Sequence, residues 1–318
     1  MSPLEAASAV SIPARPRAGG FARYAWAVLA YNVAVVLWGA LVRVTGSGAG
    51  CGNHWPLCNG TVTPLSGTAA TTLEFTHRIE FTHRMMSGLD AVLVVALVLW
   101  AFRLFPRRHP ARLGAALAGV FLVTEVLLGA ALVLLQHVGR NPSVNRAYSL
   151  SGHLVNTLAL LACLALTAWW AGGKPPVRFA GPGAWMAAAS LLAFAILGVS
   201  GVIAALGDTL FPAQSLAAGF AQDLDPAASI FLRLRIFHPL IAAAVEAWLV
   251  IFAVTSFLRR PAVKPMAWAV LAAAGVQLVA GFVNLVLLAP GWMQIVHLLL
   301  ADTLWILLVL LCASLLAV

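Results

Sequence analysis

Long runs of hydrophobic residues alternate with short polar segments along the whole chain. Each run has about 20 residues, the length at which an α-helix crosses the hydrocarbon core of a bilayer. Apolar and polar residues do not alternate over ten-residue strands, as they do in a membrane β-barrel. The pattern predicts eight membrane spans, at residues 22–44, 80–105, 111–136, 148–171, 182–205, 231–257, 265–288 and 291–317.

The composition and the charge are those expected of a protein that is surrounded by lipid. Hydrophobic residues make up 62% of the 318 residues and charged residues only 9%, so a water-soluble fold would lack a polar surface. The net charge of +9 would suggest nucleic acid binding in a soluble protein, but the basic residues lie between the apolar runs and form no single patch. We therefore expect an all-α integral membrane protein that contacts lipid and no nucleic acid.

The basic residues predict the orientation of the spans. They collect in alternate connections, at Arg15, Arg17 and Arg23, at Arg103, Arg107, Arg108 and Arg112, at Lys174 and Arg178, and at Arg259, Arg260 and Lys264. An excess of Lys and Arg marks the cytoplasmic side of a membrane protein. Both termini are therefore expected in the cytoplasm, and the chain in the plasma membrane, with the loops at 45–79 and 207–229 on the outer side.

Four histidines lie near the outer ends of the even-numbered spans, where an ionisable side chain is costly unless it has a use. They are His83, His153, His238 and His297. Their spacing predicts two pseudo-repeated four-helix bundles with parallel orientation. We expect a cytoplasmic tail at 1–21, an N-terminal half at 22–172, a cytoplasmic linker at 173–181 and a C-terminal half at 182–318.

Two imidazoles that face each other across a four-helix bundle can bind one haem iron from both sides. The two halves therefore predict two haems, and the position of all four histidines near the outer face favours chemistry there over electron transfer across the membrane. A separate hydrogen-bonding role for each histidine is the alternative. Zinc is less favoured, because no two of these histidines lie three to five residues apart and no cysteine lies at their depth.

A glutamate precedes the first of these histidines by three residues, in a unit that occurs twice in tandem. The sequence LEFTHRIEFTHR contains Glu74 with His77 and then Glu80 with His83. On a helix this spacing puts both side chains on one face, where the carboxylate can move protons beside a haem or hold the imidazole. Both copies cannot serve one haem, because a six-residue step turns a helix about 120° short of two turns. Glu80 and His83 are favoured, since the apolar run follows them directly, and Glu74 and His77 are the alternative.

Two cysteines lie seven residues apart in the first outer loop. Cys51 and Cys58 fall in a segment rich in Gly, Asn and Pro, on the side that is oxidising in a bacterial plasma membrane. A disulfide between them is predicted, with two free thiols as the alternative. Cys163 and Cys312 lie inside apolar runs, where buried and inert thiols are usual.

These residues resemble the haem A synthase family, membrane enzymes that convert haem O to haem A for terminal oxidases. The resemblance covers nearly the whole chain and rests on TGSGAGCGNHWPLCNG at 45–60, similar to the family's first outer loop, and on IEFTHRMMSG at 79–88, similar to its glutamate and histidine motif. The other three histidines match by order and span position. The chain departs from the family in the tandem EFTHR copy, in the lack of cysteines at 207–229, and in Pro239, where the family often has arginine.

The resemblance implies haem O as the substrate and haem b as a resident cofactor. The N-terminal half would hold haem O near Glu80, His83 and His153, and the C-terminal half would hold haem b at His238 and His297. Successive hydroxylations would oxidise a methyl group of haem O to a formyl group. A haem O synthase and an unidentified electron-transfer protein are the expected partners. Cys51 and Cys58 would form the disulfide. Arg233 or Arg235 would be the charged partner of a haem propionate.

Three other functions fit parts of the same sequence. A two-haem electron-transfer protein that acts with quinone at the outer face would use the four histidines but gives Glu80 no chemical task. A quinone-coupled thiol oxidoreductase would use Cys51 and Cys58 but leaves the histidines unexplained. A transporter could also contain parallel repeats, although the even-numbered spans have no obvious Gly or Pro interruption at mid-depth.

Overall fold

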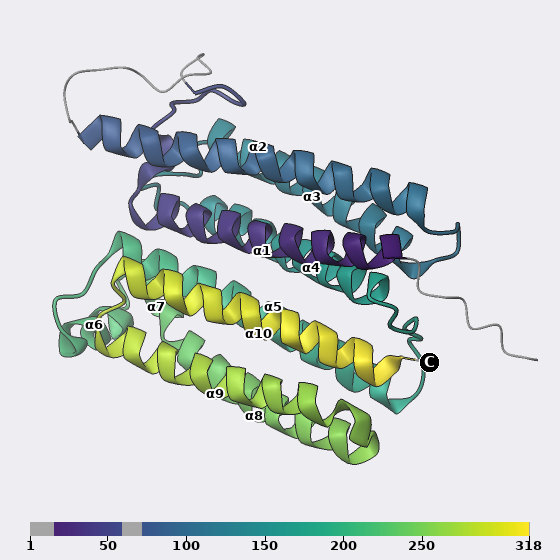
Figure 1. Cartoon of the computed structure of the whole chain (residues 1–318). Helices are drawn as coiled ribbons and strands as arrows, with labels where there is room; N and C mark the ends of the chain where they lie inside the picture. Colours follow the sequence, from purple (N-terminus) through teal and green to yellow (C-terminus); the bar gives the residue numbers. More distant parts are fainter. Residues whose placement is uncertain (1–15, 59–71, 318) are drawn as a thin grey trace, which may run out of the picture.

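The computed structural model describes residues 16–58 and 72–317, and helices make up most of it (Figure 1). In these ranges eight helices are long and apolar enough to cross a membrane. The prediction of an all-α protein with eight spans is confirmed. Residues 1–15 of the expected tail, with Arg15, and residues 59–71 of the first loop lie outside the described residues.

The first four spans run alternately in opposite directions (Figure 1). They are α1 (Pro16–Val44), α2 (Thr72–Leu104), α3 (Pro110–Leu134) and α4 (Val144–Ala171). Local sequence explains where two of them begin: α3 has proline at its first position, and the Ser143 hydroxyl accepts a hydrogen bond from the Arg146 amide at the start of α4. The helix α1 packs against α2 and α4, and α3 packs against α4.

The other four spans form the second group of helices. They are α5 (Pro182–Leu210), α7 (Ile230–Arg235) continued by α8 (Phe237–Arg259), α9 (Lys264–Val286) and α10 (Gly291–Leu316). The sixth span is thus two helices that meet at Ile236. Two short 3₁₀ helices, η1 (Ser47–Ala49) and η2 (Pro261–Val263), precede the disulfide loop and α9.

Among the differences from the sequence prediction, α2 and α5 are longer than expected and one predicted loop contains a helix. The helix α2 begins at Thr72 instead of 80, because an ion pair between Glu74 and Arg78, four residues apart, supports an extra two turns. Both EFTHR copies therefore lie on this helix. Helix α5 continues to Leu210, and the expected loop at 207–229 contains α6 (Leu216–Leu224), which begins where the Ser215 hydroxyl accepts from the Ala218 amide.

Helices α4 and α10 are the most buried spans and join the two groups. The Trp305 indole on α10 donates a hydrogen bond of 2.7 Å to the Leu158 carbonyl on α4. At the end of α1, the Arg43 guanidinium donates to the Ala205 carbonyl and Thr209 hydroxyl of α5, and to the Gln294 side chain of α10. Both contacts hold the two groups of helices together near the axis of the molecule.

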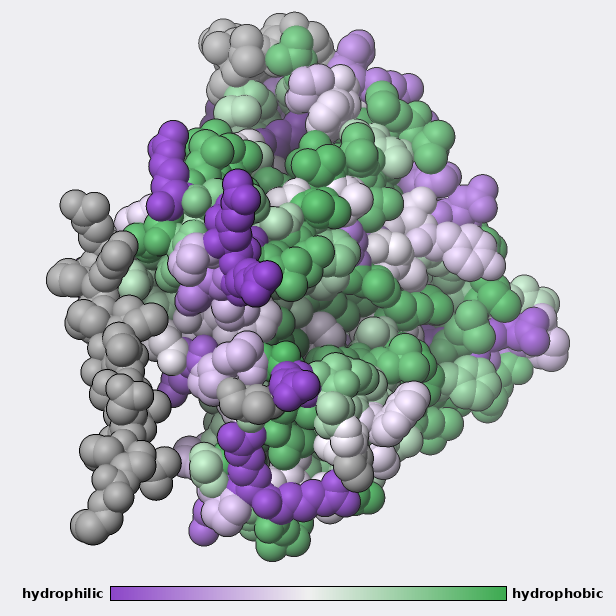
Figure 2. Space-filling model, turned by 90° about the vertical axis from the view of Figure 1, so that its right-hand side faces the viewer, coloured by the Kyte–Doolittle hydropathy of each residue, from purple (hydrophilic) through white to green (hydrophobic). Residues whose placement is uncertain are grey.

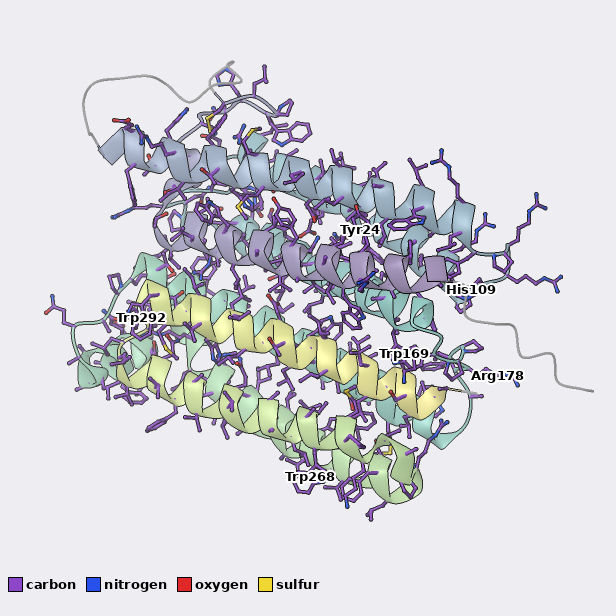
Figure 3. All side chains as sticks on the ribbon, in the orientation of Figure 1. Tyr24, His109, Trp169, Arg178, Trp268 and Trp292 are labelled. Carbon is purple, nitrogen blue, oxygen red and sulfur yellow. A yellow bond between two sulfur atoms is a disulfide. The ribbon has the colours of Figure 1, made fainter. Side chains whose placement is uncertain are left out.

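The surface is mixed in polarity at one end of the helices and largely apolar along their sides. Figure 2 views the end at which α1 begins and α10 finishes, where hydrophilic side chains stand out among hydrophobic ones. Arg178 lies at this end and Trp292 at the opposite end (Figure 3). Large apolar side chains are exposed along the sides of the helices, among them Trp185 and Phe282, which are 77% and 67% exposed. A surface of this kind fits a lipid environment.

Candidate functional site

The loop between α1 and α2 packs tightly on the start of α2. Cys51 and Cys58 form a disulfide, as predicted, and both are buried. A Cβ atom on Gly50 would lie 2.6 to 2.7 Å from the backbone of Thr76 and His77, so only glycine permits this approach of loop and helix. The loop is therefore a fixed part of the structure around the EFTHR copies.

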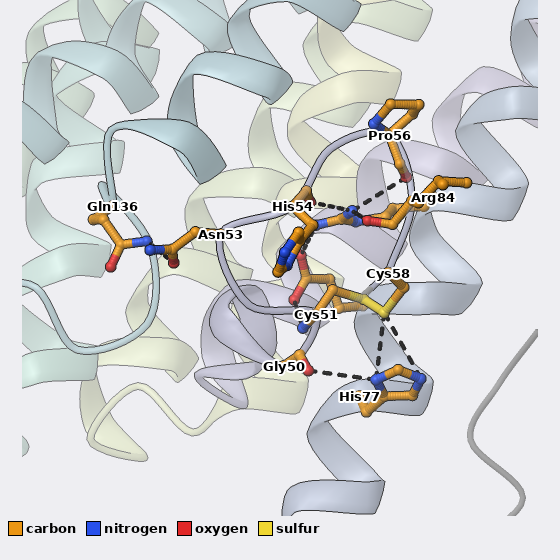
Figure 4. Close-up of polar contacts among 11 residues, drawn as sticks. Gly50, Cys51, Asn53, His54, Pro56, Cys58, His77, Arg84 and Gln136 are labelled. Atoms are coloured by element: carbon orange, nitrogen blue, oxygen red, sulfur yellow. Dashed lines mark hydrogen bonds and ion pairs between the residues drawn. A yellow bond between two sulfur atoms is a disulfide. The ribbon is translucent and has the colours of Figure 1, made fainter. Parts of the chain in front are cut away.

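Glu80 connects α2 to this loop through Arg84 and Cys51, which Figure 4 labels. Its side chain is buried, one carboxylate oxygen accepts a 2.7 Å bond from Arg84, and the other accepts a 2.8 Å bond from the Cys51 amide. Arg84 also donates to three loop carbonyls, those of His54, Pro56 and Leu57. The carboxylate is thus held in one orientation by a cation and by the backbone of the disulfide loop.

The other copy of the motif has different surroundings. The buried His77 lies with Nδ1 3.3 Å from the Cys58 sulfur and 3.4 Å from the Gly50 carbonyl oxygen. Glu74 pairs with Arg78, whose side chain is 67% exposed. Ligand atoms of His77 and of both disulfide cysteines lie within 4.8 Å of one another, but a disulfide offers no thiolate to a metal ion.

His83 and His153 face the interior between α1, α2, α3 and α4. They are close enough to interact electrostatically, and Nδ1 of His83 has no hydrogen-bond partner among the described residues. A Cβ atom on Gly39 of α1 would lie 3.2 Å from the His83 ring. Nδ1 of His153 lies 3.3 Å from a carboxylate oxygen of Glu125 on α3. The structure therefore places His83 near His153, whereas His77 contacts the disulfide loop.

A comparable arrangement occurs in the second group of helices. His238 on α8 interacts electrostatically with His297 on α10, and its Nδ1 lies 2.9 Å from the Ser200 hydroxyl of α5. Cβ atoms on Gly201 and Gly281 would lie 3.2 and 3.1 Å from the rings of His238 and His297, respectively. In both groups a glycine of a neighbouring helix gives an imidazole room to approach the backbone.

These surroundings fit ligation of haem iron. Buried ring nitrogens without a hydrogen-bond partner in the described structure occur at His83, His153 and His297. Such atoms are rare unless a further group binds them. Paired imidazoles between apolar helices are also the donors that a bis-histidine haem requires. The residues present therefore fit a haem in each group of helices.

The surroundings of three arginines could not be predicted from the sequence. Arg235 forms ion pairs with Asp208 and Asp223, so it has two carboxylate partners already, and Arg233 is exposed. Arg146 is buried, lies two turns before His153 on α4, and its Nε has no partner among the described residues. A buried guanidinium at this position can contact an acidic group of a bound molecule.

Glu125 was also missed. It is the one acidic residue between positions 111 and 136, and a carboxylate inside a predicted span is a signal of function that could have identified it.

Comparison with known proteins gives three related findings. A family model named COX15-CtaA and described as a cytochrome oxidase assembly protein matches residues 22–309. Proteins named protoheme IX farnesyltransferase from two strains of Thermus thermophilus are 49% identical over 306 residues, which cover 95% of this chain and 49% of theirs. Proteins named heme A synthase are 45% identical over 100 residues in Bacillus licheniformis and 38% identical over 121 residues in Listeria monocytogenes.

The matches cover different fractions of this chain and of its relatives. This chain spans about half the length of the Thermus relatives. The Bacillus match covers 31% of each chain, and the Listeria match covers 37% of each.

Proposed function

From the membership of this chain in the haem A synthase family of cytochrome oxidase assembly proteins, we propose that it oxidises a methyl group of haem O to a formyl group and so produces haem A. The observation that carries the proposal is the site at the start of α2. There a buried glutamate and a histidine three residues later lie on one helix, and that histidine is near a second one on α4. An electron-transfer protein would need the histidines alone.

In this proposal His83 and His153 hold the iron of haem O in the N-terminal half, at residues 22–172. Oxidation of a methyl group to a formyl group removes four electrons, which the expected electron-transfer protein takes up; where water supplies the added oxygen atom, four protons are released. Glu80 is the group that accepts protons beside the reacting methyl. Arg84 and the Cys51 amide hold the Glu80 carboxylate against the disulfide loop and so fix its position beside the bound haem.

The C-terminal half, at residues 182–318, would hold haem b between His238 and His297. Haem b supplies one-electron redox chemistry when bound. The Ser200 hydroxyl fixes the orientation of the His238 ring through Nδ1, which leaves Nε2 for the iron. The fourth spans of the two halves, α4 and α10, pack against each other in the centre of the molecule. Electrons can therefore pass between the two halves.

The orientation in the membrane is also part of the proposal. Both termini would lie in the cytoplasm, and the disulfide loop and the four histidines would lie toward the outer face of the plasma membrane. The supporting observation is the collection of basic residues at the opposite ends of the helices, as at Arg103, Arg178 and Arg259.

The name of the Thermus relatives suggests a partner. Farnesyl transfer to protohaem IX produces haem O, the substrate proposed here, and this chain matches only half of those proteins. We propose a haem O synthase as the supplier of substrate. Farnesyl transfer by this chain itself is not favoured, because a diphosphate leaving group needs carboxylates that bind Mg²⁺. Asp208 and Asp223, at the same end as the candidate site, are both bound to Arg235.

The test is expression in a host that makes haem O but no haem A, followed by pigment extraction, chromatography and mass spectrometry. We expect haem A or hydroxylated precursors from the unaltered chain and from His77→Ala, and neither from His83→Ala. Extraction of haem b alone from every variant would contradict the proposal and favour the two-haem electron-transfer protein.

A further inference from the structure

A polar network joins α3 and α4 beside His153. The Glu125 carboxylate accepts hydrogen bonds from the Asn156 amide and the Thr157 hydroxyl, which follow His153 on α4 by about one turn. Its Oε2 atom lies 3.3 Å from Nδ1 of His153, and its side chain is 19% exposed. Asn156 also bonds to Thr124 and to the Phe121 carbonyl. The carboxylate is therefore held against the ring by residues of the helix that carries the ring.

The second group of helices has a neutral residue at the matching position of its third span, where it contacts the other ring nitrogen of the histidine. Gln277 on α9 lies with its amide nitrogen 3.2 Å from Nε2 of His297. Glu125 and Gln277 each lie four residues before a glycine, Gly129 or Gly281, on the third span of their group. Each contacts the histidine of the fourth span. The two histidines thus differ in the charge of their neighbour.

This difference matters for a metal-bound imidazole. The Glu125 carboxylate is not hydrogen-bonded to His153 in the described structure, but at 3.3 Å from Nδ1 it places a negative charge beside the imidazole. Ferric haem carries one more positive charge than ferrous haem, so a nearby negative charge stabilises the ferric form more. A neutral amide supplies no such charge.

We propose that Glu125 is a positioning residue for His153 as a haem ligand, and that it makes the haem iron of the N-terminal half harder to reduce than that of the C-terminal half, where Gln277 takes its place. This inference rests on the proposed ligation of haem by His83 with His153 and by His238 with His297. The haem irons of the two halves would then have different midpoint potentials, because Glu125 has a carboxylate oxygen where Gln277 has an amide nitrogen.

The variant Glu125→Gln distinguishes an effect of the negative charge from a purely structural role of Glu125. Glu125→Gln keeps the size of the side chain and an oxygen that can accept from Asn156 or Thr157, so α3 and α4 can still be joined. It removes the negative charge beside His153. Thr124→Val is the matched control, because it removes a network hydrogen bond to Asn156 and leaves the Glu125 carboxylate in place.

The experiment is a redox titration of protohaem bound to the full chain in detergent, followed by absorption spectroscopy. In a His238→Ala chain, which confines bound haem to the N-terminal half, we expect Glu125→Gln to raise the midpoint potential. A tenfold loss in the preference for ferric haem corresponds to a rise of about 59 mV for one electron. Thr124→Val should leave the potential unchanged.

The reciprocal variant gives an independent test, and it keeps the inference testable if Glu125→Gln folds poorly. In a His83→Ala chain, Gln277→Glu should lower the potential of the haem in the C-terminal half. Equal potentials for Glu125→Gln and Thr124→Val, with haem bound in both, would overturn the inference alone. If the His238→Ala chain forms no low-spin bis-histidine haem at all, the proposed function fails and the inference fails with it.

Discussion

Replacement of Gly39 by alanine should weaken haem binding in the N-terminal half, because it crowds His83. The added Cβ atom would lie 3.2 Å from Cε1 of the ring and 3.5 Å from Nε2, so the ring or the helix must shift. Overpacking of this kind costs about 1–3 kcal/mol. Since about 1.4 kcal/mol corresponds to a tenfold change in affinity, haem affinity should fall by roughly 5- to 150-fold.

The measurement is a titration of purified apoprotein with protohaem, followed through the Soret band, in a His238→Ala chain so that only one site is observed. Gly88→Ala and Gly129→Ala are matched controls, because a Cβ atom at either position has no neighbouring atom within 4 Å. Both controls also change a helix glycine to alanine, so they account for any effect on helix stability. An affinity of Gly39→Ala equal to that of the controls would refute the packing of His83 against α1 as part of a haem site.

Three further changes test other parts of the site. Glu80→Gln should abolish conversion of haem O without loss of bound haem, as measured by pigment extraction, whereas Glu74→Gln should change neither, and equal losses in both variants would contradict the assignment. Cys51→Ser removes the disulfide and should lower the free energy of unfolding by about 2–3 kcal/mol. It should also slow conversion of haem O, because the loop amide no longer holds Glu80 firmly. Unchanged unfolding and unchanged activity would show that the disulfide does not support the carboxylate. Arg235→Met should destabilise the protein by about 3–5 kcal/mol in unfolding experiments, because it leaves two largely buried aspartates without their cation, and a loss below about 1 kcal/mol would contradict this role.

The number of spans could be predicted from the sequence because lipid leaves the backbone few choices. An apolar run in a bilayer must satisfy its own hydrogen bonds, so each such run becomes a helix. The segment at 207–229 is under no such constraint. Its helix α6 depends on the cap at Ser215 and on contacts with α7, and the break at Ile236 separates α7 from α8 within one apolar run. Hydropathy carries no signal for either feature.

The candidate ligands could be selected from the sequence by their depth, but their neighbours could not. Contacts such as Gly39 with His83, or Glu125 with His153, depend on how each helix is rotated about its axis. A helix that is apolar on all sides does not reveal that rotation in its sequence. The contact of Glu80 with the Cys51 amide likewise depends on how the loop folds back onto α2. The assignment of His83, Glu80 and the other site residues stays a prediction.

The central claim is that four particular histidines hold two haems, and the haem content of the purified protein tests it most directly. After reconstitution with excess protohaem, we expect two haems per chain. His83→Ala or His153→Ala should remove one haem, His238→Ala or His297→Ala should remove the other, and His77→Ala should remove none. A chain that keeps both haems without His83, or that loses one without His77, would contradict the account.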